Sequence, residues 1–222
     1  MVSMLMKLNT LIIGIILVPF VAISGDFSGS GGSFYFGTGS PNSIDAASRL
    51  ADYYNINDES GNYVMGLQGF YQAEKYRLGG AFQGHAWAGV NPGSNGAGED
   101  AAGVAAFVGG LYSTYTFRHD RLLLNAGAIV GAGRVYLGYK LGDRNIEKTE
   151  NVSTFYIEPQ VSFGVATCRW FAVEFQLSAP IFILTEDLRI NADGRVFTVK
   201  SGDMNGVNFS IKLTGGKIAN PY

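Results

Sequence analysis

The stretch from Thr154 to Phe182 contains two runs in which apolar side chains alternate with polar or small ones. The break between the two runs is at Thr167-Cys168-Arg169. Period two over about a dozen residues predicts a β-strand with two unlike faces. Two such strands joined by so short a break predict a long β-hairpin. The apolar face carries Phe155, Ile157, Pro159, Val161, Phe163 and Val165, and then Phe171, Val173, Phe175, Leu177, Ala179 and Ile181.

The same alternation predicts further strands along the rest of the chain. In the fifth strand we expect Val135, Leu137, Tyr139 and Leu141 on the apolar face and Arg134, Tyr136 and Lys140 on the polar one. Tight turns are expected at Glu74-Lys75 and His119-Asp120. Helical spacing of apolar residues predicts one short helix over 43–54, with Asn42 or Ser43 as its cap. The strands outside the hairpin are expected at 31–39, 62–73, 76–89, 103–118, 121–141 and 204–214.

The lengths of the connections indicate how the strands are arranged. After the first strand they run long, short, long, short, long, short and long. There are four long connections: the one that contains the helix, the segment 90–102, the charged segment 142–151 and the segment 187–203. The last contains a hairpin turn signal at Ala192-Asp193-Gly194. The rhythm predicts an all-β fold: an eight-stranded antiparallel up-and-down β-barrel with one short helix in the first long loop. All short turns and both termini lie at one end.

The first 24 residues form a separate segment. A weakly positive start is followed by the apolar run Leu8 to Ile23 and the small-x-small pattern Ala22-Ile23-Ser24. This predicts a secretory signal peptide over 1–24 and a single barrel domain over 25–222. An uncleaved membrane anchor is the alternative, but the run is shorter than the roughly 20 residues that a spanning helix needs.

Composition excludes several classes of partner. The chain is glycine-rich, with 31 glycines, and carries a formal net charge of -2 without a basic cluster, so nothing favours nucleic acid. The single cysteine, Cys168, excludes an intrachain disulfide and any multi-cysteine metal site. We expect no cofactor and no metal.

Charge counting favours the polar face as the interior of the barrel. This face carries few charged residues, whereas a soluble exterior is roughly 25–35% charged. Arg–Glu pairs can satisfy one another inside a narrow barrel, whose lumen eight strands leave just filled by side chains. An exported soluble barrel that binds a small apolar ligand in an apolar cavity is the alternative. The predicted polar network of the lumen consists of Arg77, His85, Arg134, Glu158, Glu174 and Lys212.

Signal peptide, eight alternating strands, short turns at one end and long loops at the other resemble the small eight-stranded outer-membrane barrels of Gram-negative bacteria. The stretches 63–71 and 155–159 also resemble glycine-rich exported proteins of anaerobes that have no assigned function. The first resemblance implies an outer-membrane location, with membrane lipid as partner. The chain departs from that family at its end, because 214–221 intervenes before the terminal aromatic Tyr222 and Pro221 cannot join a ladder.

Candidate chemistry is sparse. His85, with Glu99 and Asp100 in the following loop, allows a hydrolase to be considered, but a hydrogen-bonded lumen histidine is the favoured interpretation. His119-Asp120 lies in a predicted turn. The lumen charges could form a proton or ion pathway, although a structural ion-pair network is favoured. Asp187, Asn191 and Asp193 form no complete calcium loop. We therefore predict a non-enzymatic barrel that acts through its long loops in surface binding or envelope structure, for a ligand that the sequence does not identify.

Overall fold

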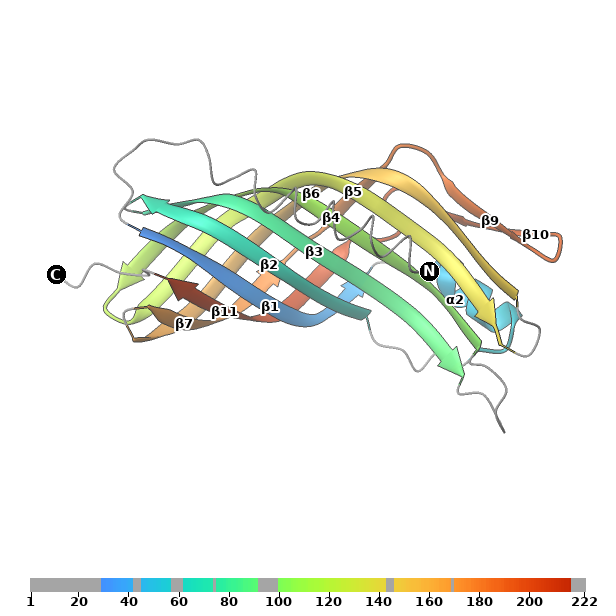
Figure 1. Ribbon diagram of the computed structural model, residues 1–222, viewed down its shortest axis with the longest axis horizontal. Helices are drawn as coiled ribbons and strands as arrows, with labels where there is room; N and C mark the ends of the chain where they lie inside the picture. Colours follow the sequence, from blue (N-terminus) through green and yellow to red (C-terminus); the bar gives the residue numbers. More distant parts are fainter. Residues whose placement is uncertain are drawn as a thin grey trace.

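The computed structural model describes residues 29–41, 45–56, 62–73, 75–91, 100–142, 146–168 and 170–216 (Figure 1). The predicted signal peptide, the candidate helix caps Asn42 and Ser43, Glu99, and the end of the chain from 217 on lie outside the described residues. The sheet strands are β1 (Gly29–Pro41), β2 (Asn62–Ala73), β3 (Tyr76–Asn91), β4 (Asp100–His119), β5 (Leu122–Leu141), β6 (Ile146–Cys168), β7 (Phe171–Ser178), β8 (Ile181–Leu184) and β11 (Gly206–Gly216).

These strands close into a ring of antiparallel pairs. Each strand pairs with its neighbour in the chain from β1 to β7, and β11 lies between β7 and β1. The first and last strands therefore join, which removes the exposed edges of the sheet. The prediction of an eight-stranded up-and-down barrel is confirmed.

β7 and β8 together fill one position in the wall. Gln160 lies opposite Ser178 and Ile157 lies opposite Ile181, so both segments share one register against β6. The interruption falls where Pro159 and Pro180 lie, because proline has no N–H to donate to the ladder. The amide of Ala179 still donates to the carbonyl of Pro159, at 3.0 Å. The continuous alternation from Phe171 to Phe182 is confirmed.

Two of the predicted long connections contain paired strands. The charged segment 142–151 was expected to be a loop, but β6 begins at Ile146 and pairs with β5 as far as Leu141. The prediction was wrong because the backbone pairing of β5 and β6 continues beyond the apolar part of the strands. Charged residues such as Lys140 and Glu147 occupy paired positions there. In the segment 187–203 the hairpin is confirmed: β9 (Leu188–Ala192) pairs with β10 (Arg195–Val199) around Asp193 and Gly194, both with positive φ, as a type I′ turn requires.

The helix α2 (Asp45–Tyr53) and the β9–β10 hairpin together form a structure that we call the cap. Figure 1 shows both at the end of the barrel that carries the long connections. The Tyr53 ring packs 5.8 Å from Phe197, and the Tyr54 ring packs 4.9 Å from Tyr139 of β5. No helix among the described residues is long and apolar enough to cross a membrane.

Near the cap the two faces of β5 exchange character. In the middle of the barrel the outward rows are apolar, and the inward rows carry the buried polar side chains, among them Gln68, Gln160 and Glu174, together with small and apolar ones such as Ile129. On β5 and β6 the outward row is apolar from Leu122 to Ala132 and from Phe155 to Val165; we call the apolar outward rows at this level the apolar band. On β5 beyond Arg134, which pairs with Ser153, the outward row holds Tyr136, Gly138 and Lys140 and the inward row is apolar, whereas on β6 the inward positions beyond Val152 hold Lys148 and Glu150.

The expected facing of the fifth strand was therefore wrong in its second half. Val135, Leu137, Tyr139 and Leu141 point inward and are buried with the cap, while Arg134 and Lys140 are exposed. Period two shows that a strand has two faces, but the environment of each face decides which is polar. Here that environment changes along a single strand.

Candidate functional site: the lumen of the barrel

The lower part of the lumen holds an ion-pair cluster around Glu174 of β7. The Arg77 guanidinium of β3 lies 3.6 Å from Glu174 Oε1, and Lys212 Nζ of β11 lies 3.4 Å from Oε2. All three side chains are buried. The carboxylate also accepts hydrogen bonds from Ser162 (2.6 Å), Thr214 (2.7 Å) and Asn125 (2.8 Å). Side chains from four other strands, β3, β5, β6 and β11, thus converge on one carboxylate of β7.

The two cations also contact aromatic faces. The Arg77 guanidinium lies 4.8 Å from the centre of the Phe70 ring, and Lys212 Nζ lies 5.7 Å from the centre of the Tyr112 ring. Burial of charge is expensive unless each charge is paired, and a cation over a ring recovers part of that cost. The cluster holds two cations for one carboxylate, so Glu174 is the member that both cations share.

A second polar cluster lies between the ion pairs and the cap. Gln83 donates to Glu158 Oε2 at 2.8 Å, donates to the Tyr156 hydroxyl, and accepts from Tyr35. His85 Nε2 lies 3.2 Å from the Tyr156 hydroxyl. Glu158 is fully buried, and among the described residues no cation lies within ion-pair distance of it. The two buried glutamates therefore have different environments.

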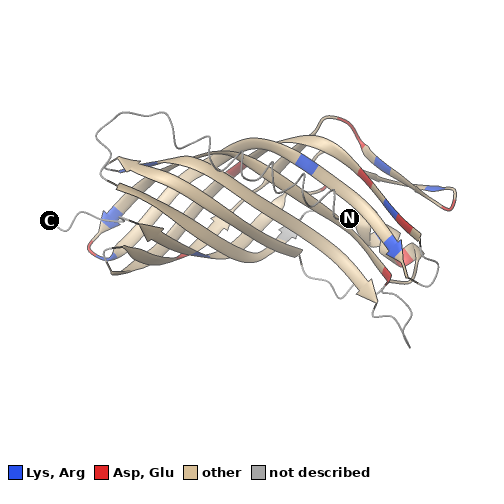
Figure 2. Cartoon of the chain, in the orientation of Figure 1, with Lys and Arg blue, Asp and Glu red and all other residues tan. Residues whose placement is uncertain are grey.

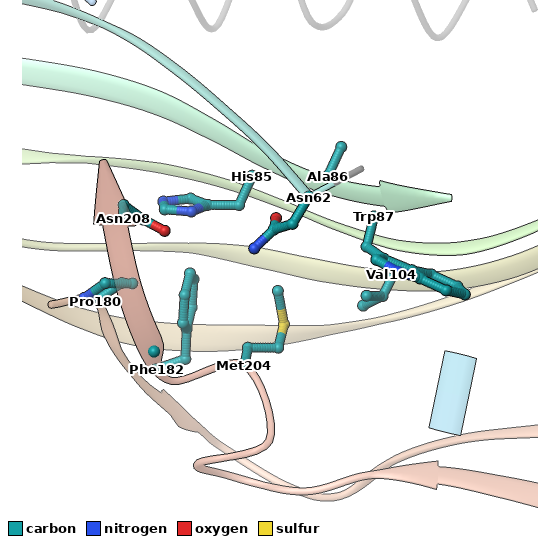
Figure 3. Close-up of a pocket in the computed structure, with 10 residues that line it drawn as sticks. Asn62, His85, Ala86, Trp87, Val104, Pro180, Phe182, Met204 and Asn208 are labelled. Atoms are coloured by element: carbon teal, nitrogen blue, oxygen red, sulfur yellow. The ribbon is translucent and has the colours of Figure 1, made fainter. Parts of the chain in front are cut away.

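A small pocket adjoins this second cluster where the lumen meets the cap (Figure 3). The His85 ring forms part of its wall and packs edge-on against Phe182 at 5.3 Å. Figure 3 shows Trp87, Phe182 and Met204 around the same space, with the amides of Asn62 and Asn208. Apolar walls with neutral polar groups can hold water or a small neutral molecule, and the lining residues include no carboxylate, serine, threonine or cysteine side chain. The lining residues are Asn62, His85, Ala86, Trp87, Val104, Pro180, Phe182, Met204, Gly206 and Asn208.

Five of the six predicted lumen residues lie inside the barrel. Arg77, Glu174 and Lys212 are brought together, while His85 and Glu158 belong to the second cluster. Arg134 was predicted wrongly: its side chain is exposed and donates to Asn151 Oδ1 at 3.0 Å. It points outward because it lies beyond the apolar band, where the polar face is the outer one.

The sequence analysis did not single out Tyr35, Gln83, Asn125 or Tyr156, all of which are buried in the two clusters. Each stands at an inward position of its strand, so the alternation already contained a signal for them. Selecting lumen residues by charge overlooked them, because hydroxyl and amide groups supply most of the hydrogen bonds that these clusters use.

The other candidate residues have ordinary structural partners. Asp100 accepts from the amide of Gly142 at 2.8 Å. Asn191 accepts from the amide of Gly194 at 3.0 Å, and Tyr54 donates to Asp193 at 3.2 Å. His119 is exposed in the turn beside Asp120, 3.9 Å away. No group of three or more His, Cys, Asp or Glu side chains in the described part of the chain is placed to hold a metal ion.

Among the described residues outside the barrel wall, Tyr54 is the titratable group whose pKa is clearly perturbed. Desolvation where the cap meets β5 is the main cause that raises the pKa of Tyr54, and the neighbouring Tyr139 and Asp193 raise it further. Tyr54 therefore remains a neutral hydrogen-bond donor to the hairpin turn, which connects the two parts of the cap.

No family model and no curated protein sequence matches this chain. Among solved structures it is similar to Neisserial surface protein A, with a TM-score of 0.49 and 9% identity over 84% of this chain and 95% of that one. It is also similar to Ail of Yersinia pestis in complex with the heparin analogue sucrose octasulfate (TM-score 0.45, 7% identity, 85% and 97% coverage). A third is the outer membrane protease OmpT from Escherichia coli (TM-score 0.38, 11% identity, 88% and 97% coverage). At these identities the similarity concerns the fold alone.

Proposed function

We propose that this chain is a non-enzymatic outer-membrane β-barrel that is embedded through its apolar band and acts through its cap end in surface binding or envelope structure. The single observation that carries the proposal is the outward position of the large apolar side chains. Phe163, Phe175 and Phe209 each expose more than half of their surface on the outside of the wall. A soluble protein rarely exposes a contiguous apolar patch of this extent.

The length of the apolar band fits a bilayer. The outward rows from Leu122 to Ala132 and from Phe155 to Val165 each span eleven residues without a charged outward side chain. A tilted strand needs about 9–11 residues to cross the hydrocarbon core. Figure 2 shows the same contrast: charge is concentrated toward the two ends of the barrel, above all on α2, β9, β10 and the adjoining ends of β5 and β6.

The exchange of faces at Arg134 supports a boundary at that level. Within a bilayer the outward side chains of a barrel must be apolar, and outside it they can be polar. Above Arg134, β5 has the facing of a soluble barrel, with Leu137 and Tyr139 inside and Lys140 outside. We interpret the part above Arg134, with the cap, as the portion that projects beyond the membrane.

The filled lumen argues against a general porin. The ion-pair cluster occupies its lower part, and one apolar cluster continues from Tyr112 and Tyr156 to Phe197 of the cap. The alternative of a soluble barrel with an apolar ligand cavity requires apolar residues inside the barrel at the level of the apolar band, where Glu174 lies opposite Gly164 and meets Arg77 and Lys212. Within the described residues His85 has the Tyr156 hydroxyl as its hydrogen-bond partner and no serine nucleophile beside it, which gives the hydrolase no support.

Fractionation with and without detergent, followed by gel mobility of unheated and boiled samples, tests the proposal. We expect the folded chain to be recovered only with detergent and to migrate as a β-rich band that shifts on boiling, because the closed ladder resists the gel detergent until heated. A monodisperse protein in plain buffer would contradict it. The His85→Ala variant tests for enzymatic activity. We expect it to leave the hydrolysis of lipid and ester substrates unchanged, and a hydrolysis rate that fell in this variant would contradict a non-enzymatic barrel.

A further inference from the structure

The ion-pair cluster of the lower lumen carries more positive than negative charge. Arg77 and Lys212 share one carboxylate, that of Glu174, at 3.6 and 3.4 Å. Both distances exceed the 2.7–2.9 Å of a charge-assisted hydrogen bond. Closer donors occupy the carboxylate oxygens, among them the hydroxyl groups of Ser162 at 2.6 Å and Thr214 at 2.7 Å. The carboxylate therefore leaves part of the hydrogen-bonding capacity of the two cations unused.

The unused capacity is clearest at Arg77. Its Nε donates to Gln72 Oε1 at 3.3 Å, and its Nη1 is the atom that faces Glu174. Among the described residues neither Nη1 nor Nη2 has a hydrogen-bond partner, although the side chain is fully buried. A guanidinium has five N–H donors and no acceptor. An additional acceptor is needed to satisfy these groups, because buried donors of a charged group are costly when they stay unpaired.

Two hydroxyl residues of β4 lie beside the two cations. Thr114 lies opposite Arg77 in the β3–β4 register, and Lys212 Nζ lies 5.7 Å from the centre of the Tyr112 ring. Both β4 residues are buried, and in the part of the chain that the structure describes neither hydroxyl has a hydrogen-bond partner. The buried amide of Gln176, on the inward face of β7, has no partner there either. Hydroxyl and amide groups can donate to an anion, so they suit the same acceptor as the cations.

The second carboxylate of the lumen lies too far away to be that acceptor. The buried charged side chains among the described residues are Arg77, Lys212, Glu174 and Glu158, so the lumen as a whole is balanced. Glu158, however, stands four residues along β6 from Ser162, which contacts Glu174. Four residues of a strand span about 13 Å. The surplus of one positive charge therefore remains local to the lower cluster.

We propose that the lower lumen binds one small monovalent anion, of the size of chloride, between Arg77, Lys212 and the hydroxyl groups of Tyr112 and Thr114. A single negative charge balances the cluster, and the lumen of an eight-stranded barrel is so nearly filled by side chains that it admits only a small ion. A water molecule would satisfy the donors but leave the charge. The site depends on the fold of the lumen and not on the membrane location, so either proposal can fail without the other.

The experiment measures how folding depends on chloride at constant ionic strength. The folded chain in a non-ionic detergent is titrated with urea while sodium gluconate, whose anion is too large for the filled lumen, is replaced by sodium chloride. An anion that binds the folded chain at one site multiplies the folding equilibrium constant by one plus the ratio of its concentration to Kd. For a Kd of about 10 mM, we expect about a tenfold rise at about 100 mM chloride.

Variants of the cluster test the site itself. Arg77→Gln and Lys212→Gln each leave one cation for one carboxylate, so both should fold and lose the chloride dependence; if one of them does not fold, the other decides. Glu174→Gln should need less chloride for the same gain, because a second positive charge is then unbalanced. Arg134→Gln makes the same change as Arg77→Gln at an exposed position, and its chloride dependence should equal that of the unaltered chain.

Two results would overturn the inference. The first is an unaltered chain whose folding constant does not change with chloride, which would mean that Glu158 or water suffices for the cluster. The second is a chloride dependence that persists in Arg77→Gln and Lys212→Gln, which would locate the effect outside the lumen. Neither result would affect the membrane barrel, which the detergent fractionation tests separately.

Discussion

Among single residues, Glu174 has the largest role in the charge balance of the lumen. It is the shared partner of Arg77 and Lys212, both fully or almost fully buried. Glu174→Gln keeps the size of the side chain but leaves two buried cations without their anion. Removal of one partner of a buried ion pair costs about 3–5 kcal/mol. We expect the free energy of unfolding, measured by urea titration in detergent or vesicles, to fall by that amount.

Glu158→Gln provides the matched comparison within the same lumen. Glu158 is equally buried, but its side chain is held by the Gln83 amide and not by a cation. Substitution therefore leaves no buried cation unpaired, and one amide–amide hydrogen bond replaces an amide–carboxylate bond. The expected loss is about 1–2 kcal/mol, below that of Glu174→Gln. Equal losses in the two variants would show that the ion pairs do not account for the stability of the lumen.

At the scale of elements, the cap is a unit that packs on the barrel without taking part in its ring of strands. Phe197 of β10 is buried against Tyr53 of α2, whereas its neighbour Val196 exposes 59% of its surface. Phe197→Ala removes a buried aromatic side chain, a change that costs about 3–5 kcal/mol in a packed core. We expect the hairpin to become sensitive to limited proteolysis between 187 and 203, with the heat-induced gel shift of the barrel unchanged.

Val196→Ala is the control for this prediction, because it shortens the adjacent exposed side chain of the same strand. Its hairpin should resist proteolysis as the unaltered chain does. If Phe197→Ala abolished the gel shift as well, the cap would be part of the cooperative barrel and not a separate unit on top of it.

The secondary structure of the barrel follows from the sequence, but the contacts between distant strands do not. The strands, the helix and the Asp193-Gly194 turn follow from local period and turn chemistry, and the ring follows from the lengths of the connections. The side on which Arg134 lies does not follow, because it depends on the level at which the outer face of β5 changes from apolar to polar. The meeting of Arg77, Glu174 and Lys212 depends on the stagger of β3, β7 and β11, which sets the residues that share a level of the lumen. A strand pattern contains no such information.

At the scale of the whole molecule, the boundary at Arg134 makes a prediction that a soluble barrel does not share. Phe163 and Asn151 both point outward from β6, the first within the apolar band and the second beyond it. In a bilayer, Phe163→Arg places a charge against lipid, at a cost that reaches about 2–4 kcal/mol at the midplane and falls toward the interfaces, while Asn151→Arg remains in water and costs close to nothing. In a soluble barrel, Phe163→Arg would replace an exposed apolar ring, 52% accessible, by a solvated side chain and would improve solubility at little cost. Reversible unfolding from vesicles, followed by the same gel shift, measures both variants against the unaltered chain. A large loss for Phe163→Arg with none for Asn151→Arg would locate the edge of the bilayer between the two residues, and equal effects would contradict a membrane boundary at Arg134.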